Sequence, residues 1–151
     1  MTSRTTLPRT ARALGYAGLL PQAAAGLILS VGPTDYHSVA LAAAMAYAAL
    51  IFSFLGALWW GLAAARSDCA PLWVWPVGVL PSLASLMAWT PWVIRAERPS
   101  FSLVVLAAGI AASALVDLRL EQLGLAPTNW FKFRLQLSLG LGALTTWCAL
   151  S

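Results

Sequence analysis

The chain has 151 residues, of which 60% are hydrophobic and only 9% are charged. A soluble domain usually has about a quarter of its residues charged, so this chain has too few polar side chains to cover a surface in water. The composition excludes an ordinary soluble protein and favours the lipid bilayer as solvent. The formal charge is +4. Because the basic residues flank apolar segments, we expect membrane lipids with anionic headgroups as partners, and no nucleic acid.

Five apolar runs follow one another along the chain, each near the roughly 20 residues that a helix needs to cross hydrocarbon. Backbone N–H and C=O groups in lipid have to be satisfied within the spanning segment, so we expect all five runs to be transmembrane helices. The sequence therefore predicts an all-α membrane protein, a bundle of five helices in one domain over residues 1–151. The predicted helices are at about 13–31, 38–65, 72–94, 100–120 and 130–150.

The first run follows a basic N-terminal segment and resembles a cleaved signal peptide, with Ala23–Ala25 as a cleavage site. The apolar stretch continues from Gly26 to Val31, however, and cleavage would strand it, so we expect the helix to be retained. It ends at Gly32-Pro33-Thr34-Asp35, which offers caps for the second helix. Thr128 or Asn129 offers a cap for the fifth helix in the same way.

Small residues recur every four positions in the second run. Residues four apart lie on one face of a helix, and small ones let a neighbouring backbone approach closely. The row in the second run is Ala49, Ser53, Ala57 and Gly61. Comparable rows in the fourth and fifth runs contain Gly109, Ser113, Ser138 and Gly142. We expect these three faces to pack against one another.

Besides Pro91 near its end, the third run contains Pro76 and Pro81, which remove backbone donors and crowd the carbonyl four residues earlier. The helix is expected to bend there and could frame a cleft walled by Trp73 and Trp75. The alternative is that these prolines are simply tolerated, as prolines in membrane helices often are.

The distribution of basic residues predicts the orientation. With the N-terminus inside, seven of the nine Lys and Arg residues fall on the inner side, as the positive-inside rule requires. Five spans then leave the C-terminus outside. Tryptophans prefer the membrane interfaces, and in this topology five of them are predicted as anchors near the inner headgroups. These five are Trp59, Trp60, Trp73, Trp75 and Trp130.

Asp117 and Arg134 lie at a similar depth in the fourth and fifth runs, about one turn from the inner interface. A carboxylate at that depth is costly alone, so we expect the two residues to form an ion pair. The pair either locks two helices together or takes part in binding or proton movement, and the sequence leaves both open.

We find no catalytic constellation and predict that the protein is not an enzyme and holds no cofactor or metal. His37 is the only histidine, and neither Cys69 nor Cys148 has a second ligand at metal-binding spacing. The predicted topology places the two cysteines near opposite membrane faces, too far apart for a disulfide, so both are expected to be free thiols.

Three segments resemble the transmembrane protein 69 family, small multi-helix proteins of bacteria and of the mitochondrial inner membrane. They are LGYAGLLP (14–21), AYAALIFSFLGALWWG (46–61) and PTNWFKFR (127–134). The resemblance implies a multi-pass protein of the bacterial inner, or cytoplasmic, membrane and implies no reaction, because the function of the family is undetermined. The family pattern in the second segment has a glycine where this chain has Ala57, and His or Arg where it has Trp59.

Three functions fit these observations. The first is an accessory or assembly subunit that packs against a larger respiratory or photosynthetic complex, with transmembrane helices of another protein or of a second copy as partners. The second is a small oligomeric carrier or channel built around Asp117 and Arg134. The third is a lipid- or quinone-binding protein with a cleft beside Pro76 and Pro81.

Overall fold

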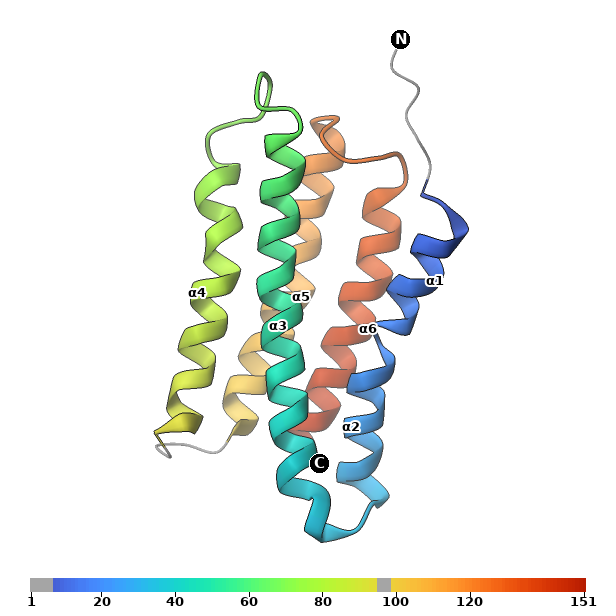
Figure 1. The fold of residues 1–151 in the computed structure, drawn as a ribbon, viewed down its shortest axis with the longest axis vertical. Helices are drawn as coiled ribbons and strands as arrows, with labels where there is room; N and C mark the ends of the chain where they lie inside the picture. Colours follow the sequence, from blue (N-terminus) through green and yellow to red (C-terminus); the bar gives the residue numbers. More distant parts are fainter. Residues whose placement is uncertain (1–6, 95–98) are drawn as a thin grey trace.

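The computed structural model describes residues 7–94 and 99–151. In these residues the chain is all-helical, as predicted, and the long helices lie side by side in a bundle (Figure 1). The elements are α1 (Arg9–Ala17), α2 (Leu20–Val31), a 3-10 turn η1 (Thr34–Tyr36), α3 (His37–Ala64), α4 (Val74–Val93), α5 (Pro99–Gln122) and α6 (Trp130–Leu150). The last four α-helices begin and end within two residues of their predicted ranges.

The first run differs from its prediction, because it is two helices and not one. The break lies at Gly18 and Leu19, directly before Pro21 in the first turn of α2. Proline has no N–H and crowds the carbonyl four residues earlier, so one continuous helix would be disrupted here. The hydroxyl of Tyr47 on α3 donates a hydrogen bond to the carbonyl of Gly18 and so fixes the break against the bundle.

The predicted side-chain caps are absent. Neither η1 nor α3 receives a capping hydrogen bond from a side chain, so Thr34 and Asp35 do not cap the second run. Asn129 precedes α6 in a left-handed conformation, with φ of 63°, and its side chain makes no capping bond. The carboxylate of Glu121 on α5 accepts backbone N–H groups at the start of α6 instead.

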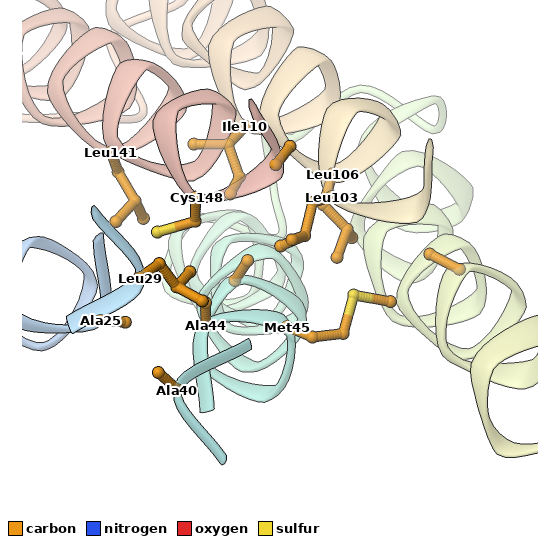
Figure 2. Close-up of a cluster of buried hydrophobic side chains, with 13 residues drawn as sticks. Ala25, Leu29, Ala40, Ala44, Met45, Leu103, Leu106, Ile110, Leu141 and Cys148 are labelled. Carbon is orange, nitrogen blue, oxygen red and sulfur yellow. The ribbon is translucent and has the colours of Figure 1, made fainter. Parts of the chain in front are cut away.

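Two apolar clusters fill the bundle. The larger one lies where α2, α3, α5 and α6 converge and also includes Ala88 of α4; Figure 2 shows its labelled side chains directed toward one another. Its largest fully buried members are Met45, Leu103, Leu106, Ile110 and Cys148. The smaller cluster lies nearer the other end of α3 and includes Leu55, Trp59, Val74, Leu120 and Leu125.

The sequence predicts that the small-residue row of α3 faces α5 and α6, but Ala49 and Ser53 contact serines of α4 instead. The backbones of α3 and α4 come close at Gly56, which does not belong to the row. A Cβ on Gly56 would lie 2.1 Å from the carbonyl oxygen of Gly78, whereas a Cβ on Gly61 would meet nothing within 4 Å. Residues four apart advance about 400° around a helix, so a row at every fourth position drifts about 40° per step. Ala49 and Ser53 therefore face α4, but Ala57 and Gly61 have rotated out of the contact and are exposed.

The predicted rows of α5 and α6 face each other only in part. Ser113 and Ser138 meet in the buried contact, with their hydroxyl oxygens 3.3 Å apart. Gly142 also lies in it, since a Cβ there would be 3.2 Å from the carbonyl oxygen of Ala107. Gly109, in contrast, faces the ring of Phe52 on α3.

The prolines of α4 lie in a helix that is continuous from Val74 to Val93. Pro76 is in its first turn, where a backbone N–H has no partner within the helix in any case. Pro81 is in the interior and is buried, with its Cδ 3.2 Å from the position of a Cβ on Gly56.

Candidate functional site

Asp117 is fully buried and is the centre of a polar cluster in an otherwise apolar bundle. Its Oδ1 accepts hydrogen bonds from the indole nitrogens of Trp59, at 3.1 Å, and of Trp130, at 3.0 Å. Its Oδ2 pairs with Nε of Arg134 at 3.1 Å. We call these four residues the Asp117 cluster.

The Asp117 cluster joins three helices. Asp117 belongs to α5 and Trp59 to α3, while Trp130 and Arg134 are four residues apart on one face of α6. A buried carboxylate is tolerated only when it is hydrogen-bonded and paired with a positive charge. Because three donors from two other helices meet this requirement, the cluster holds α3, α5 and α6 in one relative position.

Two of the five predicted interfacial anchors have a different role. Trp59 and Trp130 are 2% and 8% exposed, so they are buried donors to Asp117 and do not face the headgroups. Trp60 and Trp73 are exposed, and Trp75 is half-buried. Trp60 donates its indole N–H to the backbone oxygen of Trp75, and the two rings meet edge to face with centroids 4.9 Å apart.

Sequence reasoning missed these donors because it assigned every tryptophan to an interface. The signal that was available is the spacing of Trp130 and Arg134, since residues four apart on one helix face the same neighbour. The indole N–H is a donor without an acceptor function, so it suits a carboxylate that needs further partners.

Glu121, one turn beyond Asp117 on α5, satisfies the start of α6. Its carboxylate accepts the backbone N–H groups of Asn129, at 3.1 Å, and of Phe131. The first N–H groups of a helix have no partner within the helix, and a negative charge there is favourable. Two acidic residues of α5, four positions apart, thus contact the first two turns of α6.

Arg134 also borders a cavity of about 200 Å³ beside the break between α1 and α2. The cavity lies among α1, α3, α5 and α6, and its other lining residues except Ser138 are apolar or glycine. A second cavity, of about 340 Å³, lies between α3 and α4 and is lined by alanines, serines, two leucines and Trp89. Neither cavity is lined by Pro76 or Pro81, the residues of the predicted cleft.

The hydrogen bonds that Asp117 accepts determine what the site can do chemically. Both oxygens of Asp117 accept hydrogen bonds from fixed side chains, so the carboxylate is held as a structural acceptor. Within residues 7–94 and 99–151 no three His, Cys, Asp or Glu side chains lie close enough to hold a metal ion. Cys69 is exposed and Cys148 is buried, and neither forms a disulfide.

Three segments of the described chain are long and apolar enough to cross a membrane: Arg9–Val31, Thr34–Ala64 and Ser100–Gln122. At 20 and 21 residues, α4 and α6 have the length of a span as well. They are less apolar, since α4 carries three prolines and α6 begins with Lys132 and Arg134. An all-helical bundle with such segments, and with its buried charges paired inside, is a multi-helix membrane protein.

The chain belongs to the transmembrane protein 69 family. The family model described as "Protein of unknown function (DUF3429)" matches residues 7–150. Transmembrane protein 69 of Xenopus tropicalis is 35% identical over 129 residues, which are 83% of this chain and 47% of that protein. The chain therefore spans about half the length of this relative. No solved structure matches the chain.

Proposed function

We propose that the protein is a non-catalytic accessory or assembly subunit of a larger complex in the bacterial inner membrane, of respiratory or photosynthetic type. The observation that carries this proposal is a strip of small residues on α3 that no other helix of the described chain covers. Ala57 and Gly61 are exposed, and a Cβ on Gly61 would meet nothing within 4 Å.

The proposal includes five spans with the N-terminus inside. It rests on the length of α4 and α6 and on their position alongside α3 and α5 in the bundle (Figure 1). It rests also on the basic residues, of which seven of nine would lie on the inner side. The break after α1 then lies below the inner membrane surface, with the amphipathic α1 near the headgroups.

The occupant that we propose for the uncovered strip is a transmembrane helix of a partner protein. Small residues allow two helix backbones to approach, which is what drives association where lipid gives no hydrophobic force. The cavity between α3 and α4 continues this surface through Ala46, Ala49 and Ser53. The Ser53 and Ser82 hydroxyls lie 2.8 Å apart and exposed, so a helix can offer them a hydrogen-bonding partner that acyl chains lack.

A carrier or channel centred on Asp117 is less well supported. Proton or ion movement requires a group that water or substrate can reach, whereas Asp117 is 0% exposed and all its partners come from the bundle. The same observations favour a rigid bundle that presents its outer surface to another protein.

The experiment is site-specific photo-crosslinking in native membranes. A photoreactive amino acid in place of Gly61 is expected to give one protein adduct of defined mass, identified by mass spectrometry. The matched control is the same amino acid in place of Leu115, which is 66% exposed on α5 and is expected to react with lipid. Equal lipid-only labelling at both positions would contradict the proposal. An adduct with a second copy of the chain would contradict the partner protein and would show self-association instead.

A further inference from the structure

The cavity beside Arg134 has the features of a binding site that opens to the lipid. Leu14 and Phe54 line it and are 74% and 59% exposed, so its mouth faces the bilayer. Its inner wall is formed by buried residues of three helices, including Leu55, Ile110 and Leu141. A lipophilic molecule can therefore enter sideways from the membrane without passing through water.

The depth of the cavity is made by the break in the first run. Gly15 and Gly18 line it on the side of α1. A Cβ on Gly15 would lie 2.5 Å from the ring of Phe133, so glycine lets α1 lie close to α6 here. Its volume of about 200 Å³ is somewhat larger than the roughly 150 Å³ of an apolar cavity that holds benzene. The cavity thus accommodates one six-membered ring with substituents, while a tail remains between Leu14 and Phe54.

Arg134 supplies the polar end of this cavity. A guanidinium has five N–H donors, and the structure shows one of its nitrogens, Nε, bonded to Asp117. Among the described residues no acceptor is seen for Nη1 or Nη2, although the side chain is only 10% exposed. The two terminal nitrogens retain some accessible surface, and because hydrocarbon offers no hydrogen-bond acceptor, a ligand oxygen in the cavity would satisfy them.

The charge of the site selects a neutral ligand. The positive charge of Arg134 is already balanced by Asp117 at 3.1 Å. A carboxylate or phosphate entering the cavity would add a second buried negative charge with no counter-ion, which is unfavourable in a low-dielectric site. A carbonyl oxygen accepts the same hydrogen bonds without that penalty.

We propose that this cavity binds the ring of a lipid-soluble quinone, with a ring carbonyl accepting hydrogen bonds from the terminal amino groups of Arg134 and the tail leaving past Leu14 and Phe54. The site differs from the cleft that the sequence suggested beside Pro76 and Pro81. The proposal concerns binding alone and includes no reduction or oxidation of the quinone.

The test is equilibrium binding of tritiated decylubiquinone to the full chain in phosphatidylcholine nanodiscs. Wild-type protein is expected to bind one quinone per chain, saturably, above the amount that dissolves in empty nanodiscs. Tritiated decylbenzene, which has the ring and tail but no carbonyl, and decanoate, which has a charged head, are expected to bind at least tenfold more weakly.

Three variants locate the site. Ile51→Phe fills the cavity, Leu14→Trp blocks its mouth at an exposed position, and Arg134→Lys keeps the charge beside Asp117 but removes the two terminal amino groups. Each is expected to weaken quinone binding at least tenfold. Leu83→Phe, at an exposed position of α4, is the matched control and is expected to bind as wild type does.

Melting curves show which variants are folded, and Leu14→Trp keeps the test decisive if Ile51→Phe or Arg134→Lys does not fold. The proposal is overturned if wild type takes up no more quinone than empty nanodiscs, if decylbenzene or decanoate binds as tightly, or if folded Leu14→Trp binds as well as Leu83→Phe.

Discussion

Trp59 and Trp130 donate their indole hydrogens to the same oxygen of Asp117, from two different helices and at 3.1 and 3.0 Å. The other oxygen of that carboxylate pairs with Arg134. In lipid the hydrophobic effect does not distinguish one arrangement of apolar helices from another, so packing and polar contacts determine how the helices sit together. The Asp117 cluster supplies such contacts for α3, α5 and α6.

Trp59→Phe tests the shared oxygen, because it keeps an aromatic ring in the core and removes the N–H donor; Trp60→Phe loses the same ring atoms. Hydrogen bonds to charged groups contribute about 1.5–3 kcal/mol, and neutral ones about 0.5–1.5 kcal/mol. We expect Trp59→Phe to lower the free energy of unfolding within the first range. The control is Trp60→Phe, because the indole N–H of Trp60 donates to a neutral backbone oxygen. We expect this variant to lose stability within the smaller range, that of neutral hydrogen bonds. Equal losses in reversible detergent unfolding would contradict the role of Trp59.

Gly56→Ala and Gly61→Ala test which face of α3 is packed, because the structure packs Gly56 against α4 whereas the four-residue spacing placed Gly61 in the packed row. A methyl group on Gly56 would collide with the backbone of Gly78, and overpacking of this kind costs about 1–3 kcal/mol. Gly61 has open space around it, so alanine there is expected to be neutral or to stabilise the helix by up to about 1 kcal/mol. The reverse order of stabilities would show that the face of α3 that carries Gly61 is the packed one.

The two native cysteines report orientation without any substitution. Cys69 is exposed in the connection between α3 and α4, which lies inside in the proposed topology, and Cys148 is buried in α6. A membrane-impermeant maleimide is expected to label Cys69 in inverted membrane vesicles and not in intact spheroplasts. Cys148 is expected to react only after denaturation. Labelling of Cys69 from outside would reverse the proposed orientation.

Glu121→Ala removes the acceptor for the first backbone N–H groups of α6. Loss of an N-terminal cap costs about 0.5–2 kcal/mol, and loss of the negative charge near the helix dipole adds to it. We expect a destabilisation of about 1–2 kcal/mol, with faster amide hydrogen exchange confined to the first turn of α6. Gln122→Ala, the exposed neighbour, is expected to change stability by less than about 0.5 kcal/mol. Unchanged exchange in Glu121→Ala would contradict the role of Glu121.

The sequence predicted the helices well, because their length is set by the bilayer and their ends by Pro, Gly and charged residues. It predicted α6 at residues 130–150, as the structure has it. It did not predict the break at Gly18, since one proline near the middle of an apolar run is compatible with either a continuous or an interrupted helix.

The sequence predicted the site less completely. The depth of Asp117 and Arg134 was sufficient to predict that they face each other. The roles of Trp59 and Glu121 depend on how helices are rotated about their axes, and that rotation is fixed by contacts distant in the chain. The same rotation explains why the predicted row on α3 does not stay on one packed face. The direction of its side chains drifts by about 40° per four-residue step, which is small over one step and large over three.

The most direct measurement of the central claim, that the Asp117 cluster holds the bundle together, is a double-mutant cycle with Asp117→Asn, Arg134→Gln and the double variant. Each single change leaves one buried group without its counterpart, so we expect each to lower the free energy of unfolding by about 3–5 kcal/mol. The double variant is expected to lose less than the sum of the two, with a coupling energy of about 1–3 kcal/mol. Strictly additive losses, or an Asp117→Asn variant as stable as the wild type, would contradict the claim.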